Sequence, residues 1–312
     1  MIIFDIILFV LSCFLLYRGA DHLIDNSRIL VNKFAISPIV VGATVVALGT
    51  SLPELIVSTI FSFNGQSLRV YGNIVGSNIA NISLALGLVY VMSQLKIEYQ
   101  SIKRDILFLI STTLLFVMLI FNNLLDMRFG FLLLFLFAIY LSMIVIDTRR
   151  EKIEARLVDK VEEGYLFYLF LGIFLLSSGS FMFDYSSNQI AVFFNVSDML
   201  LGVTLIAIGT SAPEIVTSMV SLRKNENEFV VGNIIGSNLM NILIVLGVSS
   251  IISTIDISDI NYNAIYAHSI LLLGSSIFLY SQLRMNSTSN RIDGFLLIGL
   301  YFVFLFFTYN YN

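Results

Sequence analysis

Two short polar segments of matching composition lie in the two halves of this chain: GTSLPE at 49–54 and GTSAPE at 209–214. Each is followed by a segment rich in glycine, serine and asparagine, GNIVGSNIAN at 72–81 and GNIIGSNLMN at 232–241. The carboxylate, amide, hydroxyl and carbonyl oxygens of such segments are ligands for hard cations. Because none of the four segments contains histidine or cysteine, the chemistry that they favour is cation binding by oxygen.

The two pairs of segments belong to an internal duplication. Residues 42–88 and 202–248 align without a gap at a constant offset of 160, and they share 20 identical residues in 47. Such self-similarity shows that both halves derive from one structural unit. We therefore expect one site built from both halves of the chain.

Most of the chain is too apolar for a soluble protein. Charged residues make up 12% and hydrophobic residues 57%, whereas soluble domains carry about 25% charged residues. A helix that crosses the hydrocarbon core of a bilayer needs about 20 apolar residues. Apolar runs of suitable length lie at 2–17, 38–62, 70–93, 105–121, 129–147, 165–183, 198–222, 229–253, 264–281 and 292–309. The sequence therefore predicts an all-α membrane protein with ten transmembrane helices.

The basic residues are distributed unequally between the two sides of this ten-span arrangement. Of the 17 Lys and Arg residues, 15 follow odd-numbered spans and only Arg69 and Arg128 follow even-numbered ones. Basic residues are retained on the cytoplasmic side of membranes. We therefore expect a multi-pass protein of the cell (plasma or inner) membrane, with both termini on the extracytoplasmic side. Its expected surroundings are the lipid bilayer, and the charge pattern does not suggest nucleic acid binding.

An odd number of spans in each half implies that the two halves cross the membrane in opposite directions. We expect residues 1–147 to form the first five-helix repeat and residues 164–312 to form the second, inverted one. The charged segment 148–163 between them is predicted to be a cytoplasmic linker. Inverted repeats of this kind are common in secondary transporters, whose substrate sites lie at the repeat interface near the bilayer midplane.

Each duplicated motif places a glutamate in the middle of a predicted span. Glu54 falls in span 2 and Glu214 in span 7, and an ionisable residue at such a depth indicates a functional site. Each follows a proline, Pro53 or Pro213, which removes a helical hydrogen bond. We therefore expect helices 2 and 7 to be broken, with freed carbonyl oxygens lining a cavity. The alternative is a pair of protonated carboxylic acids that only pack helices together, or an ordinary proline kink.

Helical spacing groups further oxygen-bearing residues with the two glutamates. Residues three and four apart share a helix face, and residues four apart on spans 3 and 8 add serine and asparagine side chains. The candidate cation ligands are Glu54, Glu214, Asn81, Asn241, Thr50, Thr210, Ser51, Ser211, Ser77 and Ser237, together with the carbonyls of Ala47 and Ala207. Four more asparagines, Asn73, Asn78, Asn233 and Asn238, either cap helices or contribute to the same site.

The charge of this set suggests what it could bind. Two carboxylates balance one Ca²⁺, which takes six to eight oxygen ligands, and they can equally hold two or three Na⁺ ions. Competition of the two ions for shared ligands would make their exchange obligatory. The expected mechanism is alternating access, in which spans 1 and 6 move against the other helices around a fixed site.

The paired GTSxPE and GSNxxN motifs resemble the alpha repeats of the sodium/calcium exchanger superfamily (cation/calcium exchangers), and the chain resembles its compact prokaryotic sodium/calcium antiporters. The resemblance covers the two repeats in detail and the whole chain in its number of spans. It implies a ten-helix inverted-repeat fold and export of Ca²⁺ driven by entering Na⁺, without a cofactor and without enzymatic activity. A monomer would be sufficient for transport.

The resemblance also assigns the central site. It implies that Glu54 and Glu214 are the central ligands for Ca²⁺ and Na⁺, and that the other candidates named above complete the sites. Asn241 departs from part of the family, in which this position is an aspartate. Loss of that carboxylate leaves the central site with a charge of −2 and makes potassium co-transport less favourable.

Three other functions fit parts of the pattern. A proton-coupled cation exchanger would use Glu54 or Glu214 as a proton carrier. An intramembrane hydrolase would use Ser51 or Ser211 as a nucleophile, but the motif offers no His or Lys as base. A passive channel could also be lined by polar rings, although buried glutamates from opposed halves favour a carrier.

Overall fold

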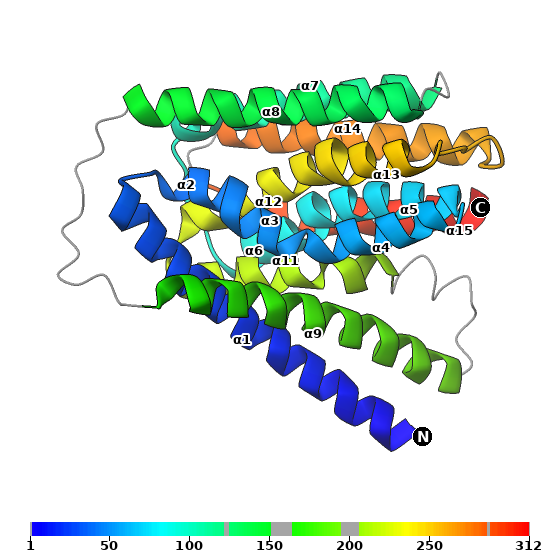
Figure 1. Ribbon diagram of the computed structural model, residues 1–312, viewed down its shortest axis with the longest axis horizontal. Coiled ribbons are helices and arrows are strands. Elements are labelled where there is room, and N and C mark those ends of the chain that lie inside the picture. Colours follow the sequence, from blue (N-terminus) through cyan, green and yellow to red (C-terminus); the bar gives the residue numbers. More distant parts are fainter. Residues whose placement is uncertain (1, 122–124, 151–163, 195–205, 286–287, 312) are drawn as a thin grey trace.

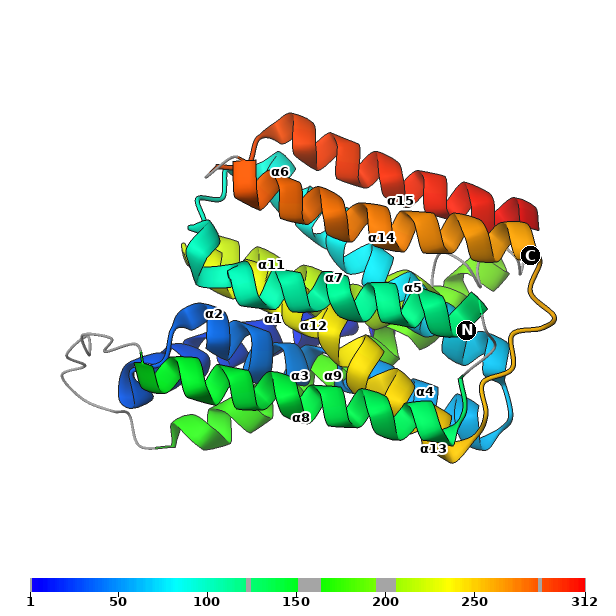
Figure 2. The same ribbon diagram turned by 90° about the horizontal axis from the view of Figure 1, so that it is seen from above.

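The computed structural model of this protein describes residues 2–121, 125–150, 164–194, 206–285 and 288–311, with side chains left undescribed at 148–150, 206–208 and 311. These residues form helices, and within the same ranges the β-structure is limited to an isolated bridge between Lys96 and Thr288. The long helices run roughly along one common direction (Figure 1 and Figure 2). The predicted all-α fold is therefore confirmed for the described part of the chain.

The helices are distributed over both halves of the chain. The first half contains α1 (Ile2–Phe34), α2 (Pro38–Val41), η1 (Gly42–Val46), α3 (Ala47–Thr50), α4 (Leu52–Phe63), α5 (Ser67–Ile79), η2 (Ala80–Ala85), α6 (Leu86–Met92), α7 (Tyr99–Phe121) and α8 (Met127–Arg150). The second half contains α9 (Tyr165–Phe193), α11 (Ile206–Arg223), α12 (Asn227–Met240), η4 (Asn241–Val245), α13 (Leu246–Ile252), α14 (Tyr262–Met285) and α15 (Arg291–Tyr311). The η segments are single π-helical turns inside longer helices.

Eight helices in the described ranges are long and apolar enough to cross a membrane, and a bent pair, Pro38–Thr50 with Leu52–Phe63, makes up to nine. The first part of the predicted seventh span, 198–205, falls outside the described residues, and the rest of it, 206–222, belongs to α11. The structure therefore confirms a helical protein with many apolar spans. Ten spans remains a prediction.

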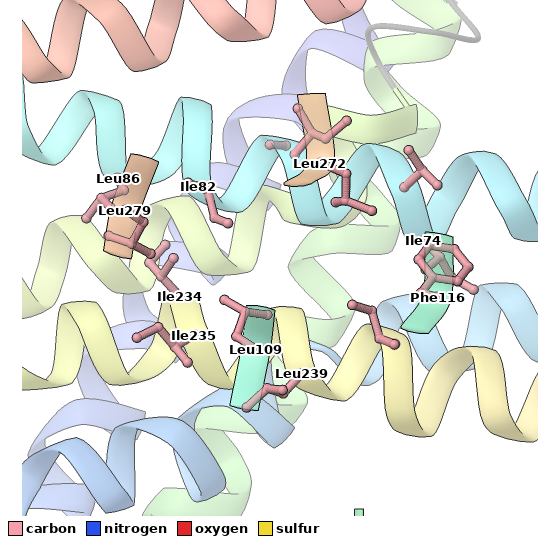
Figure 3. Packing of buried hydrophobic residues seen from close by; sticks show 14 of the residues in the cluster. Ile74, Ile82, Leu86, Leu109, Phe116, Ile234, Ile235, Leu239, Leu272 and Leu279 are labelled. Atoms are coloured by element: carbon pink, nitrogen blue, oxygen red, sulfur yellow. The ribbon is translucent and has the colours of Figure 1, made fainter. Parts of the chain in front are cut away.

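Two continuous spans form the centre of the bundle. In the most apolar window of Asn227–Ile252, 94% of the residues are buried, and in that of Ser67–Met92 83% are, against 22% for α1 and α8. The central hydrophobic cluster accordingly combines side chains from α5, α12, α7 and α14 (Figure 3). The peripheral helices expose large apolar side chains such as Phe4 and Phe295, as expected of helices that face lipid tails.

The span with the first motif is broken where the sequence predicts. Its helix starts at Pro38 after the N-cap Ser37, whose Oγ accepts a hydrogen bond from the Val40 N–H at 3.3 Å. It is interrupted at Ser51, which has a non-helical ψ of 5°, and the axes of the two parts differ by 46°. Since Pro53 has no N–H, the carbonyl of Gly49 loses its helical donor. The prediction of a broken helix 2 is thus confirmed.

The span with the second motif is not broken in its described part, which corrects the prediction for helix 7. Helix α11 runs continuously from Ile206 to Arg223 through Pro213. The carbonyl of Gly209, which Pro213 leaves without its helical donor, instead accepts a hydrogen bond from Ser180 Oγ at 3.0 Å. The position related to Ser180 by the offset of 160 is Ala20, which has no hydroxyl. Helix α3 therefore lacks the equivalent support beside Pro53.

The first helix is much longer than the predicted span 2–17. Helix α1 continues to Phe34, so Arg28 and the other charges expected in a loop lie on helical turns. They are paired there: Lys224 Nζ lies 2.6 Å from Asp21 Oδ1 and 2.6 Å from Asp25 Oδ1, and Arg28 Nε lies 2.8 Å from Glu226 Oε1. These ion pairs join this end of α1 to the turn between α11 and α12. The charged side chains thus stabilise the helix extension through tertiary contacts.

Helices from the two halves pack against each other in reciprocal pairs. The longest contact joins α1 to α9, α12 packs on α2, η1 and α3, and α11 packs on α5 and η2. In the same way α15 packs on α6, and α8 packs on α13. Both chain ends lie toward the same end of the bundle in the two views (Figure 1 and Figure 2). The centre of the molecule is thus formed by the four helices that carry the duplicated motifs.

Candidate functional site

The hydroxyl groups of the two motifs meet across the interface between the halves. Thr50 Oγ1 lies 3.1 Å from Ser237 Oγ, and Ser77 Oγ lies 3.2 Å from Thr210 Oγ1. The second pair is related to the first by the sequence offset of 160. All four side chains are buried. The motifs are therefore brought together in one polar centre, and each half supplies the same kinds of atoms to it.

The two glutamates lie in this centre with most of their oxygens unbonded. Glu54 is 1% exposed and Glu214 is 0% exposed. Ser51 Oγ donates a hydrogen bond to Glu214 Oε1 at 3.2 Å, which links the first motif to the second glutamate. Glu214 Oε2 and both carboxylate oxygens of Glu54 have no hydrogen-bond partner among the described residues. A buried acceptor without a partner costs about 1–3 kcal/mol, and more for a charged group.

The two asparagines of the GSNxxN motifs show the same property. Asn81 and Asn241 are fully buried, and neither the amide oxygen nor the amide nitrogen of either side chain has a partner in the described part of the chain. Asn81 lies in the π-helical turn η2 and Asn241 begins the π-helical turn η4. Such π-turns are frequently found at functional sites. Ser211 Oγ is also buried and unbonded within the described residues.

None of the other four asparagines, Asn73, Asn78, Asn233 and Asn238, is an N-cap. The N-cap residues of α5 and α12 are Gln66 and Glu226, so the capping interpretation is wrong. Asn78 and Asn238 donate to the carbonyls four residues earlier, at 2.7 and 2.9 Å. They therefore bond within their own helices.

Asn73 and Asn233 connect helices instead. Asn73 Nδ2 donates to the backbone carbonyl of Glu54 at 3.3 Å and to Ser58 Oγ at 2.8 Å. Asn233 Oδ1 accepts a hydrogen bond from Thr50 Oγ1 at 3.1 Å. Both side chains therefore position the residues of the first motif.

The backbone carbonyls only partly follow the expectation. The Ala47 carbonyl is not freed, because it accepts a hydrogen bond from Ser51 N at 2.9 Å, and Thr50 Oγ1 lies 3.2 Å from it. The carbonyls that lose a helical donor are those of Gly49 and Gly209, four residues before each proline. Ala207 lies in the first turn of α11, and its side chain is outside the described set. A carbonyl oxygen has two lone pairs. An ion at the Ala47 carbonyl would therefore have to share this oxygen with the hydrogen bond that it already accepts.

The composition of this centre restricts what it can bind. In the described ranges no group of three or more His, Cys, Asp and Glu side chains lies together in a way that could hold a metal ion. A cation in the centre would therefore be held by two carboxylates together with neutral oxygens. Such a donor set suits Ca²⁺ and Na⁺ better than zinc or copper, which prefer nitrogen and sulfur.

A family model for the sodium/calcium exchanger protein matches residues 4–146 and 164–310. The chain belongs to the sodium/calcium exchanger family. This exchanger is 34% identical over 309 residues to inner membrane protein YrbG of Escherichia coli, covering 96% of this chain and 94% of the relative. It is 27% identical to sodium/calcium exchanger MaX1 of Methanosarcina acetivorans, covering 98% of each chain.

The exchanger is also similar to solved structures. A structure of the sodium–calcium exchanger NCX_Mj, soaked with 2.5 mM Na⁺ and 0.1 mM Sr²⁺, superposes with a TM-score of 0.83 at 31% sequence identity, covering 97% of this chain and 98% of that chain. The fold and the family agree over nearly the whole chain. The protein is therefore a multi-pass membrane transporter of the compact prokaryotic type that exchanges cations.

Three further polar residues lie beside this centre, outside the duplicated motifs. Ser180, Asp184 and Asn188 lie on α9, and all three line a cavity of about 280 Å³ that also contacts Pro53 and Thr210. Their spacing of four residues in an otherwise apolar helix was a signal in the sequence, because it predicts one polar helix face. The duplication concealed this signal because the face is not repeated in α1, where Ala20 and Ile24 occupy the positions equivalent to Ser180 and Asp184.

Proposed function

We propose that this protein exchanges Na⁺ for Ca²⁺ across the cell membrane by alternating access, and that the Na⁺ gradient drives Ca²⁺ extrusion. The observation that carries the proposal is the set of buried, unbonded oxygens around Glu54 and Glu214. Two buried carboxylates without a counter-charge are costly, and bound cations would remove that cost. The proposed ligands are Glu54, Glu214, Asn81, Asn241, Thr50, Thr210, Ser51, Ser211, Ser77 and Ser237, with the carbonyls of Ala47 and Ala207.

Charge balance makes the two ions competitors at this centre. One Ca²⁺ neutralises two carboxylates, and two or three Na⁺ ions can do the same with the hydroxyl and amide oxygens completing their shells. An empty centre would keep two uncompensated charges buried while the helices rearrange. Return of the carrier without an ion is therefore unfavourable, and transport in one direction requires transport in the other. Asn241 leaves the centre at a charge of −2, which does not call for an additional K⁺.

We also propose ten spans in two inverted five-helix repeats, residues 1–147 and 164–312, joined by a cytoplasmic linker at 148–163. The family model matches two segments with nearly these limits. The reciprocal hydrogen bonds Thr50 with Ser237 and Ser77 with Thr210 support a two-fold relation between the halves, and so do the reciprocal helix pairs. The excess of Lys and Arg after odd-numbered spans supports extracytoplasmic termini.

The moving part would be the pair α1 and α9, spans 1 and 6. These two helices make extensive contacts with each other, and their backbones approach closely where Gly19 meets Gly172. A Cβ atom at Gly19 would lie 2.8 Å from Gly172 O, so small residues permit this contact. The pair lies along one side of the bundle (Figure 1). It can therefore shift as a unit against the central helices, and a single chain contains every element of the mechanism.

The direct test is calcium uptake into proteoliposomes that contain the purified protein. With Na⁺ inside and Na⁺-free buffer outside, at the same pH on both sides, we expect accumulation of radioactive Ca²⁺ that stops when the Na⁺ gradient is abolished. Protein-free liposomes and liposomes with K⁺ in place of Na⁺ are the controls. Uptake that follows an imposed pH gradient and ignores the Na⁺ gradient would contradict the proposal and indicate a proton-coupled exchanger.

The unbonded amides allow a separate prediction about ion binding. Because Asn81 makes no hydrogen bond with the described residues, Asn81→Leu should leave the thermal stability in ion-free buffer unchanged or slightly raised. A bound ligand stabilises a protein by about 2.7 kcal/mol at a concentration one hundred times its Kd. We therefore expect the variant to lose most of the Ca²⁺-dependent rise in Tm that the wild type shows. The measurement is Tm in detergent, with and without Ca²⁺.

Asn78→Leu is a matched control for this experiment. Its amide donates to Ile74 O at 2.7 Å within the helix, so its loss should lower Tm equally in the presence and absence of Ca²⁺. If Asn81→Leu behaved in the same way, with equal losses under both conditions, the amide would have a structural role only.

A further inference from the structure

One acidic side chain outside the duplicated motifs lies within a membrane-spanning helix and faces a cavity. Asp184 is on α9 and lines the cavity of about 280 Å³ described above, together with Asn188 and Ser180. Asn188 Nδ2 donates to Asp184 Oδ1 at 3.3 Å. Among the described residues Asp184 has no ion pair. Acidic residues inside transmembrane segments usually face water-filled cavities and mark ion pathways.

The cavity borders the proposed central site directly. Its lining includes Pro53, the residue before Glu54, and Thr210, whose Oγ1 lies 3.2 Å from Ser77 Oγ. The cavity volume of about 280 Å³ is many times what one water molecule needs, and polar side chains line part of its wall. A Ca²⁺ or Na⁺ ion that keeps its inner hydration shell would therefore fit beside Asp184. It would lose these waters only on entering the central site.

The position of Asp184 is held by the second motif itself. A Cβ atom at Gly209 would lie 3.1 Å from Asp184 Oδ1, so a glycine at this point allows the carboxylate to lie against α11. Ser180, one helical turn before Asp184, donates a hydrogen bond from its Oγ to the Gly209 carbonyl at 3.0 Å. Helix α9 thus places its only acidic residue against the turn that precedes Glu214.

The arrangement is present on one side of the site only. At the offset of 160, Asp184 corresponds to Ile24, which is 0% exposed, and Ser180 corresponds to Ala20. Asp184 also lies in the C-terminal part of α9, toward the end of the bundle where both chain termini lie (Figure 1). The charge distribution predicts that this end is extracytoplasmic. On the opposite approach, along α1, the apolar Ile24 takes the place of Asp184, and the neighbouring Asp21 and Asp25 are both paired with Lys224.

The second charged residue of the cavity has the opposite sign. Arg69 lines another wall of the cavity, where its guanidinium lies 5.6 Å from the centroid of the Phe61 ring and its Nη1 lies 3.5 Å from Gln66 Oε1. It forms no ion pair with Asp184 in the structure as described. It therefore reduces the attraction of the cavity for cations without removing it.

We propose that Asp184 and Asn188 form an outer binding position for a hydrated Ca²⁺ or Na⁺ ion, which collects cations from the extracytoplasmic side before they enter the central site. This position rests on the proposed exchange function and adds an asymmetry to it, since the equivalent position of α1 is occupied by Ile24. A charged, low-dielectric cleft raises the local concentration of a counter-ion and its association rate, by roughly ten- to thousandfold. A single carboxylate in a hydrated cavity should act at the lower end of this range.

The test compares half-saturating Ca²⁺ concentrations on the two sides of sided membrane vesicles. For Asp184→Asn we expect the value on the extracytoplasmic side to rise by about three- to tenfold at low ionic strength, and the value on the cytoplasmic side to stay unchanged. Added salt that shortens the Debye length from about 30 Å to about 8 Å should reduce the difference between Asp184→Asn and the wild type on the extracytoplasmic side. Asp184→Glu, which keeps the charge, should have the wild-type half-saturating Ca²⁺ concentration on the extracytoplasmic side. Arg69→Gln should lower that concentration.

A surface control separates this effect from the general charge of the membrane face. Asp259 is exposed in the turn between α13 and α14, on the same predicted side, and Asp259→Asn should leave both values unchanged. If Asp184→Asn does not insert, Asp184→Ser provides a second neutral variant. Equal shifts on both sides, or no shift in an otherwise active exchanger, would overturn the outer binding position. Absence of Na⁺-dependent flux in the wild type would instead reject the exchange function itself.

Discussion

Glu54→Gln should abolish Na⁺-dependent Ca²⁺ flux while the protein still inserts and folds. Neither carboxylate oxygen of Glu54 has a hydrogen-bond partner among the described residues, so the amide replaces no internal contact. It does remove one of the two negative charges that would balance a bound Ca²⁺. Loss of one partner from a buried charge interaction costs about 3–5 kcal/mol. Since every 1.4 kcal/mol is a factor of ten, the flux should fall at least about a hundredfold.

Glu214→Gln should have the same effect on flux for the same reason. Its side-chain oxygen could still accept the hydrogen bond from Ser51 Oγ, which is 3.2 Å from Glu214 Oε1, so the fold should again be retained. Removal of only that donor, in Ser51→Ala, should weaken transport much less than loss of either carboxylate. The measurement is Na⁺-driven uptake of radioactive Ca²⁺ in proteoliposomes containing equal amounts of each variant.

Glu98→Gln is the matched control for both carboxylate variants. Glu98 is exposed in the segment before α7, outside the duplicated motifs, and its replacement makes the same chemical change without touching the centre. We expect flux equal to that of the wild type. Normal transport by Glu54→Gln or Glu214→Gln, with the control also normal, would reject the central site.

The second large effect is expected at the contact between the first-motif span and α12. A Cβ atom at Gly232 would lie 2.6 Å from Ile39 O and 3.1 Å from Ala43 N. Both are backbone atoms, so no rotamer change can relieve the contact. Overpacking of a core costs about 1–3 kcal/mol, and here it would also separate Thr50 from Ser237. We expect Gly232→Ala to lower Tm by roughly 5–10 °C and to reduce flux strongly.

Gly274→Ala provides the comparison for this variant. Gly274 is also within a helix, α14, but no described atom lies within 4 Å of a Cβ atom at that position. Alanine is favoured over glycine in a helix by about 1 kcal/mol, so Tm should stay the same or rise slightly. The measurement is the Tm of both variants in detergent, with thermal unfolding monitored by size-exclusion chromatography. Equal Tm values for the two variants would show that the backbone approach at Gly232 is not required.

The sequence predicted much of this site because its chemistry is local. The residue types of the two motifs specify oxygen ligands, and Pro53 specifies a missing hydrogen bond four residues earlier, whatever surrounds them. Composition likewise specifies a membrane helix protein, since a polar backbone in lipid must satisfy its own hydrogen bonds. The family relation and the cation chemistry could therefore be derived without coordinates.

The sequence was misleading where the outcome depends on a neighbouring helix. Pro53 and Pro213 lie in closely similar segments, GTSLPE and GTSAPE, yet only the first breaks its helix in the described structure. The difference comes from α9, where Ser180 supplies a donor to the Gly209 carbonyl, while Ala20 in α1 cannot do so for Gly49. The length of α1 was underestimated for a similar reason, because its charged turns are paired with Lys224 and Glu226.

The amino-acid sequence alone determined the class of the protein, its duplication and the oxygen-rich residues that can bind a cation, because these follow from residue types and from covalent geometry. Only the tertiary structure decided which of those oxygens remain unbonded. Asn78 and Asn81 have the same side chain, but one bonds within its helix while the other is left without a partner. That distinction depends on which atoms the packing of two halves brings within hydrogen-bond distance, and no local pattern contains it.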